Sequence, residues 1–275
     1  MRFIQSFENA TAIQTAVNEG NLGKPYVAYD KENQVVDWNS KEKPDYSKMY
    51  LTFEITEDGS ITYNCENGYV TGNTIEYSVN GGEWLTTTAV PYNVIGNFAT
   101  GDTIRFRGNN THYGNGNSGI CNQFTKSTAK FKVFGNIMSL IYGDDFIDKK
   151  ELVAEYAFTY MFKSCSGLTD AGNLILPATT LARNCYGNMF AGCTSLTKAP
   201  TILPATTLAN RCYYAMFYDC ASLNYIKCLA LNNPSAYTTY WTVGVSSTGT
   251  FVKAAGVEWP TGTSGIPEGW TVEEV

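Results

Sequence analysis

The chain contains few residues of the types that do chemistry, and its cysteines are the largest group. Six of the eight cysteines fall in one periodic segment, as C-x7-C pairs such as Cys185 with Cys193 and Cys212 with Cys220. Zinc sites favour shorter spacings such as C-x2-C, so the pattern argues against a metal site. Disulfides between neighbouring repeats are sterically conceivable, but buried cysteines ordinarily serve as small apolar side chains. We therefore expect reduced, structural cysteines.

The other candidates for catalysis or ligand binding are isolated from one another. The one histidine, His112, lies in a polar glycine-rich stretch without a nucleophile or second metal ligand, so we expect an exposed loop residue. Asp144, Asp145 and Asp148 lack the interleaved spacing of a calcium loop and are expected in a solvated acidic turn. Residues 114–119, GNGNSG, lack the terminal Gly-Lys-Ser/Thr of a phosphate-binding loop. The sequence predicts no enzyme, no metal ion and no cofactor.

The cysteines belong to an internal repeat. Leu176–Pro200 reads LPATTLARNCYGNMFAGCTSLTKAP and Leu203–Lys227 reads LPATTLANRCYYAMFYDCASLNYIK, an offset of 27 residues, and a degenerate earlier copy lies at Glu155–Asn173. Because one unit cannot bury its apolar face alone, we expect the units to stack on one another. Equivalent cysteines then form two ladders, Cys165 with Cys193 and Cys220, and Cys185 with Cys212.

Each repeat is predicted to contain a short helix. Leu181, Cys185 and Met189 recur at i, i+4 and i+8, which places them on one face of an amphipathic helix, and Thr179 can serve as its N-cap. Leu196 follows in a brief run compatible with a strand. Each unit is therefore expected to form a helix, a turn and a short strand.

Period-two alternation of apolar and polar residues marks the region before the repeats. Residues 50–134 contain runs such as LTFEIT, TIEYSV and TIRFR that are typical of strands. Asn80-Gly81-Gly82 and Asp58-Gly59 each separate two such runs and predict hairpin turns. Short strands at this spacing predict an immunoglobulin-like β-sandwich.

The first 45 residues differ from both of these regions. A small amphipathic helix is expected around Asn9 to Asn18, followed by two strands joined near Asp30 to Asn33. About 45 residues bury little surface alone, so the segment is expected to dock on another structure.

The repeat motif LPATTLA..CY..MF.GCTSLT resembles the BspA-type leucine-rich repeats of Bacteroidetes surface proteins and their phages. The resemblance covers about Tyr156 to Lys227 and implies a leucine-rich-repeat solenoid. Residues 241–274 look like the segment that closes such arrays. Its large apolar residues, Trp241, Phe251, Trp259 and Trp270, are expected to cover the open end of the core.

The segment LGKPYVAY…VDWNS is similar to the N-termini of structural proteins of Bacteroides phages, including crAss-like phages. This resemblance implies attachment to the capsid or tail proteins of a virion. An alternative is that the strand pair packs on the chain's own β-sandwich. The residues implied in anchoring are Leu22, Pro25, Tyr26, Val27, Tyr29 and Trp38.

Composition excludes several other roles. The net charge is -6 and no basic cluster occurs, which argues against nucleic-acid binding. No apolar run is long enough for a membrane span or a signal peptide. This fits the resemblance to virion proteins, which implies assembly in the host cytoplasm and release by lysis. A secreted adhesin should instead carry a signal peptide.

These observations predict a mainly β protein with short helices and four parts: an anchoring segment (1–45), a β-sandwich (46–136), a solenoid (137–230) and a C-terminal cap (231–275). The expected function is that of a phage head or tail fibre, a homodimer or homotrimer that binds a host-surface glycan or protein through multivalency. The alternatives are a bacterial cell-surface adhesin and a carbohydrate-binding appendage of an enzyme. Exposed aromatic residues that could stack on sugars are Trp84, Tyr92, Tyr113, Tyr214 and Tyr218.

Overall fold

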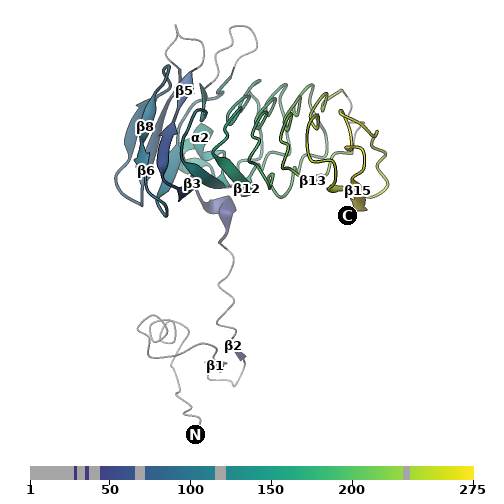
Figure 1. The fold of residues 1–275 in the computed structure, drawn as a ribbon, viewed down its shortest axis with the longest axis horizontal. Coiled ribbons are helices and arrows are strands. Elements are labelled where there is room, and N and C mark those ends of the chain that lie inside the picture. Colours follow the sequence, from purple (N-terminus) through teal and green to yellow (C-terminus); the bar gives the residue numbers. More distant parts are fainter. Residues whose placement is uncertain (1–27, 30–34, 37–43, 66–71, 115–121, 232–235) are drawn as a thin grey trace. The chain divides into compact units, whose positions relative to one another are not determined.

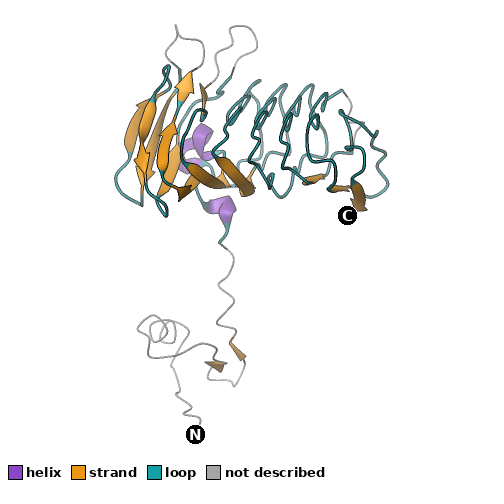
Figure 2. Ribbon diagram, viewed as in Figure 1, coloured by secondary structure: helices purple, strands orange, loops and turns teal. Residues whose placement is uncertain are grey.

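The computed structural model describes residues 28–29, 35–36, 44–65, 72–114, 122–231 and 236–275. The chain divides into two compact units, residues 1–45 and residues 46–275. Strands, turns and loops dominate the described residues and helices are few and short (Figure 2), which confirms the prediction of a mainly β protein. No described helix has both the length and the apolar character that crossing a bilayer requires.

The first unit contains one described strand pair. β1 (Ala28–Tyr29) and β2 (Val35–Val36) are antiparallel, with Ala28 opposite Val36 and Tyr29 opposite Val35. The predicted strand pair is therefore confirmed. The helix predicted around Asn9 to Asn18 and the turn at residues 30–33 lie outside the described residues.

The second unit begins with a mixed six-stranded sheet, which contains β3, β6 and β12 (Figure 1). The order of its strands is β12-β11-β3-β9-β6-β7. β11 pairs in parallel with β12, and the other neighbours are antiparallel. Because β12 lies in the repeat region, this sheet joins the N-terminal part of the unit to the repeats. The strands are β3 (Leu51–Glu57), β6 (Thr74–Val79), β7 (Leu85–Thr88), β9 (Thr103–Arg107), β11 (Lys130–Asn136) and β12 (Leu168–Ile175).

Smaller sheets enclose a core against one face of the large sheet. The ring of Phe53 on β3 lies 4.8 Å from that of Phe124, and Phe124 lies 5.1 Å from the ring of Tyr63. All three side chains are fully buried. The remaining elements of this part are β4 (Gly59–Thr62) paired with β8 (Val94–Phe98), β5 (Asn64–Cys65) paired with β10 (Asn122–Gln123), and the short helices η1 (Tyr46–Lys48), α2 (Ser139–Tyr142) and η2 (Gly143–Asp145).

One of the two predicted hairpin turns is confirmed and the other is wrong. Asn80 and Gly81 have φ of 49° and 76° and join β6 to β7, which pair antiparallel. Asp58-Gly59 instead carries the chain from one sheet to another, because β3 pairs with β9 and β11 whereas β4 pairs with β8. A Cβ on Gly59 would lie 2.4 Å from the backbone nitrogen of Ala129, so glycine is needed there for close approach.

The predicted repeat helices are absent, and consecutive turns take their place. We call residues 156–165, 184–193 and 211–220 the first, second and third ribbons. In each ribbon every second amide donates to a carbonyl of the next coil, as the amide of Phe158 does to Cys185 at 2.7 Å. The amides between these close turns within the ribbon, as the amide of Met161 does by donating to Phe158 at 3.3 Å. Every fourth residue has positive φ: Tyr156, Tyr160 and Ser164, then Asn184, Asn188 and Gly192, then Arg211, Ala215 and Asp219.

The helix prediction failed because two structures share nearly the same spacing. Apolar residues at i, i+4 and i+8 suit one face of an α-helix, and they also recur once in every four-residue turn of a ribbon. An α-helix would keep its amide bonds within one repeat. In a ribbon half of the amides donate to carbonyls of the neighbouring coil, so these hydrogen bonds hold the coils together.

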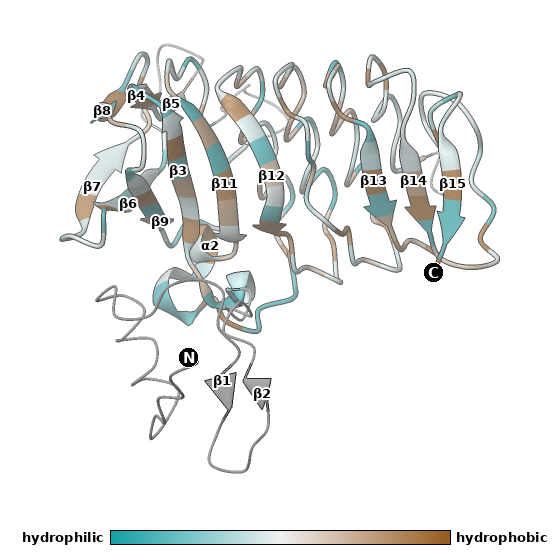
Figure 3. Cartoon of the chain, turned by 60° about the horizontal axis from the view of Figure 1, so that its bottom comes forward, coloured by the Kyte–Doolittle hydropathy of each residue, from teal (hydrophilic) through white to brown (hydrophobic). Residues whose placement is uncertain are grey.

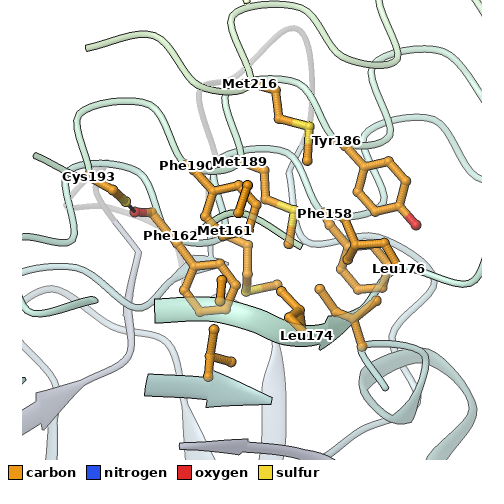
Figure 4. Close-up of a cluster of buried hydrophobic side chains, with 14 of the residues drawn as sticks. Phe158, Met161, Phe162, Leu174, Leu176, Tyr186, Met189, Phe190, Cys193 and Met216 are labelled. Carbon is orange, nitrogen blue, oxygen red and sulfur yellow. Dashed lines mark hydrogen bonds between the residues drawn. The ribbon is translucent and has the colours of Figure 1, made fainter. Parts of the chain in front are cut away.

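Aromatic residues from successive coils stack inside the repeat region (Figure 4). The rings of Phe162, Phe190 and Phe217 are spaced 5.5 and 5.8 Å apart and are nearly parallel. A second stack runs through Phe158, Tyr186 and Tyr213 at spacings of 5.9 and 6.0 Å. The repeats therefore share one continuous core, as their sequences predict.

The N-terminal part of the unit supplies the first layer of both stacks. The amide of Tyr113 donates to Ala157 at 2.8 Å, and that of Phe124 donates to Met161 at 2.8 Å. Their rings lie 6.0 Å from Phe158 and 5.9 Å from Phe162, respectively. Tyr113 and Phe124 thus extend the two stacks by one layer, which joins the two parts of the unit through a single core.

The cysteines lie in the core as predicted. The seven described cysteines are free and buried. Within the ladders the thiol of Cys193 donates to the Phe162 carbonyl at 2.9 Å, and that of Cys220 donates to the Phe190 carbonyl at 3.1 Å. Burial raises the pKa of Cys165 and of Cys185 to about 12. These thiols stay protonated and serve as small apolar groups with one donor each.

Parallel strands and tryptophans complete the C-terminal end. β13 (Tyr225–Cys228), β14 (Thr250–Lys253) and β15 (Thr271–Glu274) lie side by side in Figure 3 and pair in parallel. Trp241 continues the second aromatic stack at 6.2 Å from Tyr213 and contacts Trp259 at 5.5 Å. Trp241, Phe251, Trp259 and Trp270 are all buried, as expected for large apolar residues at the end of a core.

Candidate functional site

The five aromatic residues predicted to contact a ligand lie in separate places. Tyr113 is in the core, Trp84 and Tyr92 are on different loops, and Tyr214 and Tyr218 are on the third ribbon. No single site therefore contains all five.

The prediction for Tyr113 is wrong. Its side chain is fully buried, and its hydroxyl donates to the Leu140 carbonyl at 2.6 Å. Burial raises the pKa of this hydroxyl. Tyr113 therefore stabilises the fold as the first layer of an aromatic stack and presents no surface to a ligand.

Trp84 lies in an electrostatic network on the large sheet. The guanidinium of Arg107 lies 4.2 Å from the centre of its ring, and that of Arg105 lies 5.4 Å away. Arg107 also pairs with Glu76 at 2.9 Å and with Asp144 at 2.8 Å. The indole is held by cation–π contacts, which accounts for its position without a ligand.

Asp144 is exposed, as the prediction of a solvated acidic turn requires, and it also belongs to this network. Its carboxylate accepts hydrogen bonds from Arg107 and, at 2.9 Å, from the hydroxyl of Tyr50. The bond from Arg107 lowers the pKa of Asp144 below its usual value. Asp145 and Asp148 are exposed, as predicted.

Tyr92 is the most exposed tyrosine, tryptophan or phenylalanine among the described residues. It is 79% exposed, has φ of 58°, and has the ammonium of Lys126 4.9 Å from its ring centre. Val90, in the same loop, and Val94, the first residue of β8, are also exposed. The loop around Tyr92 therefore forms a small exposed apolar surface.

The ribbons carry a larger aromatic surface. Tyr156 and Tyr160 on the first ribbon are half-buried, Tyr214 on the third is half-buried, and Tyr218 is 39% exposed. Cations lie beside three of these rings: Arg183 at 5.8 Å from Tyr156, Lys163 at 4.9 Å from Tyr160, and Arg211 at 5.6 Å from Tyr214. We call this surface the tyrosine face.

Sequence reasoning found Tyr214 and Tyr218 but missed Tyr156, Tyr160 and Tyr240. Tyr240 is 51% exposed and its ring lies 6.2 Å from that of Tyr214. The repeat could have revealed two of them, because Tyr160 and Tyr240 occupy equivalent positions, and Tyr156 lies one four-residue turn before Tyr160.

The remaining predicted site residues can be placed briefly. His112 is exposed, as predicted, and its Nδ1 lies 3.1 Å from the hydroxyl of Thr111. The described ranges contain no group of three or more His, Cys, Asp or Glu side chains placed to hold a metal ion. Of the predicted anchoring residues, Tyr29 lies in β1, whereas Leu22, Pro25, Tyr26, Val27 and Trp38 lie outside the described residues.

Comparison with models of protein families, with curated proteins and with solved structures gives no match to this chain.

Proposed function

We propose that this chain is a non-enzymatic virion structural protein of a bacteriophage, a head or tail fibre that binds glycans on the host surface. In this proposal residues 1–45 attach to capsid or tail proteins. The sheets of residues 46–136 form an immunoglobulin-like sandwich, and the coils form a BspA-type leucine-rich-repeat solenoid. The released virion is the place where the protein acts, as a homodimer or homotrimer.

The observation that supports the proposal is which positions of the repeat motif are buried and which are exposed. The Cys-Tyr and Met-Phe pairs of the motif lie in the shared core of the coils, while Tyr160 in the first ribbon and Tyr214 in the third are partly exposed. A rigid stack of coils can display many weak contact points, and several chains in one fibre multiply them into useful avidity.

The division of the chain supports the proposed attachment. Residues 1–45 form a compact unit distinct from residues 46–275, and the larger unit contains the continuous core. A leader can then bind a virion partner while the larger unit folds on its own hydrophobic interior.

The test uses particles of a phage that encodes this chain. Mass spectrometry and negative-stain imaging of purified particles should detect the full-length protein, and a version lacking residues 1–45 should fold but fail to incorporate. If the protein is absent from particles, or if the truncated version incorporates equally well, the virion proposal is wrong. A bacterial surface adhesin would then account better for the same modules.

A further inference from the structure

The six-stranded sheet ends at β7, and this edge of the sheet is open. β7 is the outermost strand, and no described strand pairs with its second side (Figure 3). The amide of Ala89 donates to Asn73 at 3.0 Å, so by the alternation of an antiparallel pair the backbones of Thr87 and Leu85 also bond to β6. The amide and carbonyl of Thr86 therefore point away from the sheet.

One row of apolar side chains on the core face of the sheet runs out to this edge. Leu51, Phe106, Tyr77 and Leu85 lie opposite one another on the neighbouring strands β3, β9, β6 and β7. Leu51 and Phe106 are fully buried and Tyr77 is partly buried, whereas Leu85 is 49% exposed. The core is thus incompletely covered at β7.

The loop that follows β7 adds to the exposed apolar surface. The side-chain amide of Asn93 donates to the hydroxyl of Thr87 at 2.9 Å and to the carbonyl of Thr88 at 3.0 Å, which holds this loop beside the strand. Val90 and Tyr92, in the loop, are exposed, as Leu85 is. The strand and the loop together form one exposed surface, which we call the β7 edge.

The β7 edge lacks the features with which proteins protect edge strands from pairing. Charged side chains and proline within the strand are the usual protection. β15, the last strand of its own sheet, contains the exposed Glu273 and Glu274. β7 reads Leu-Thr-Thr-Thr, and residues 84–101 contain no charged side chain. The chain therefore protects one edge with charge and leaves the other available for a further strand.

A second copy of this chain suits the β7 edge. The net charge of -6 makes two copies repel one another over most surfaces, and a two-fold axis brings each side chain of an interface close to its own copy. An uncharged surface avoids that repulsion. When two β7 strands pair antiparallel about such an axis, Thr86 lies opposite Thr86 of the second copy, and each outward amide can donate to the other outward carbonyl.

We propose that the protein forms a two-fold homodimer in which the β7 strands of two copies pair antiparallel through Thr86. The two six-stranded sheets then become one continuous sheet, and the second copy covers Leu85. The inference rests on the homo-oligomer of the proposed function, for which it selects a dimer, and it does not depend on attachment to a virion.

The test is sedimentation equilibrium of the full chain over a series of protein concentrations. The wild type should form a dimer, and Thr86→Pro, which removes the outward amide from both copies, should raise the Kd of the dimer at least tenfold. Edge strands tolerate proline where the amide faces solvent, so this variant should fold. Val272→Pro is the matched control, because the amides of Thr271 and Val275 bond to the β14 side and that of Val272 points away from it. It should dimerise as the wild type does.

A second pair of variants tests whether β7 pairs with itself. Thr86→Lys and Thr86→Glu should each dimerise more weakly than the wild type, because like charges meet across the axis, and an equimolar mixture of the two should recover the dimer. Thermal melting should show that every variant folds.

A wild type that is monomeric at every concentration overturns the proposal and leaves this edge to a strand of another protein, whereas the particle experiment still decides the virion role. An oligomer that Thr86→Pro leaves unchanged, or a mixture that recovers no dimer, would show that the copies do not meet through paired β7 strands.

Discussion

Replacing Gln123 by methionine should make the protein more stable. Gln123 is fully buried, and neither the oxygen nor the nitrogen of its side-chain amide has a hydrogen-bond partner. The bond from the Phe124 amide to Met161 aligns Gln123 with Met161, and the ribbon pattern continues through Met189 and Met216. Methionine is therefore the residue that the next three coils hold at this position.

The magnitude follows from the two unpartnered amide atoms. A buried polar group without a partner costs about 1–3 kcal/mol, and methionine has nearly the same length and fills the same space without that cost. We expect Gln123→Met to raise the free energy of unfolding by about 2 kcal/mol. For a unit of this size that gain corresponds to a rise in Tm of about 4–8 °C.

Thermal melting followed by circular dichroism, with urea unfolding as a second measure, checks this expectation. Gln123→Ala is the control, because it removes the amide but leaves a cavity that offsets the gain. A Gln123→Met protein that melts at or below the wild-type temperature would refute the reasoning, since it would mean that the amide is well satisfied in the folded protein.

Three further outcomes are expected. Phe190→Ala, at the centre of an aromatic stack, should lower the free energy of unfolding by about 3–5 kcal/mol in urea titrations. Phe190→Leu should lower the free energy of unfolding much less. Equally small effects of the two substitutions would contradict a shared core. Asp144→Asn should modestly reduce the free energy of unfolding above pH 4, because the pKa of Asp144 is lowered in the folded protein. The difference from wild type should vanish as the pH falls through that lowered pKa. A difference in melting temperature that stays constant across this pH range would argue against the ion pair. The seven described cysteines should not react with a thiol reagent at pH 8 until urea is added, and peptide mapping that finds native labelling at Cys193 or Cys220 would disprove their burial.

The stacking of repeats could be predicted because self-similarity in the sequence reports directly on equivalent environments. Leu196, Cys193 and Phe190 each recur one repeat later, and each is fully buried in both copies. The burial of Trp241, Trp259 and Trp270 was predictable for a related reason, because large apolar side chains near the end of a core are expected to cover it.

The local conformation of the repeats was not predicted, since a four-residue period is consistent with both a helix and a ribbon of turns. Asn184, Asn188 and Gly192 at every fourth position were the discriminating signal, because these residues favour positive φ. Tyr113 was misplaced for a different reason. It lies in a polar, glycine-rich stretch, and its burial depends on docking against Phe158, which sequence periodicity does not report.

The ribbons also determine which changes in repeat length the fold can tolerate. Met161, Met189, Met216 and Trp241 occupy equivalent positions at separations of 28, 27 and 25 residues, yet the positive φ values within the ribbons stay four residues apart. The differences in length must therefore be absorbed on the strand side of each coil. Single-residue insertions should be tolerated there. Within a ribbon only the insertion or deletion of four residues, one full turn, would keep both the inward side chains and the hydrogen bonds between coils in register. New coils can accordingly be added by duplication while their connecting loops vary freely.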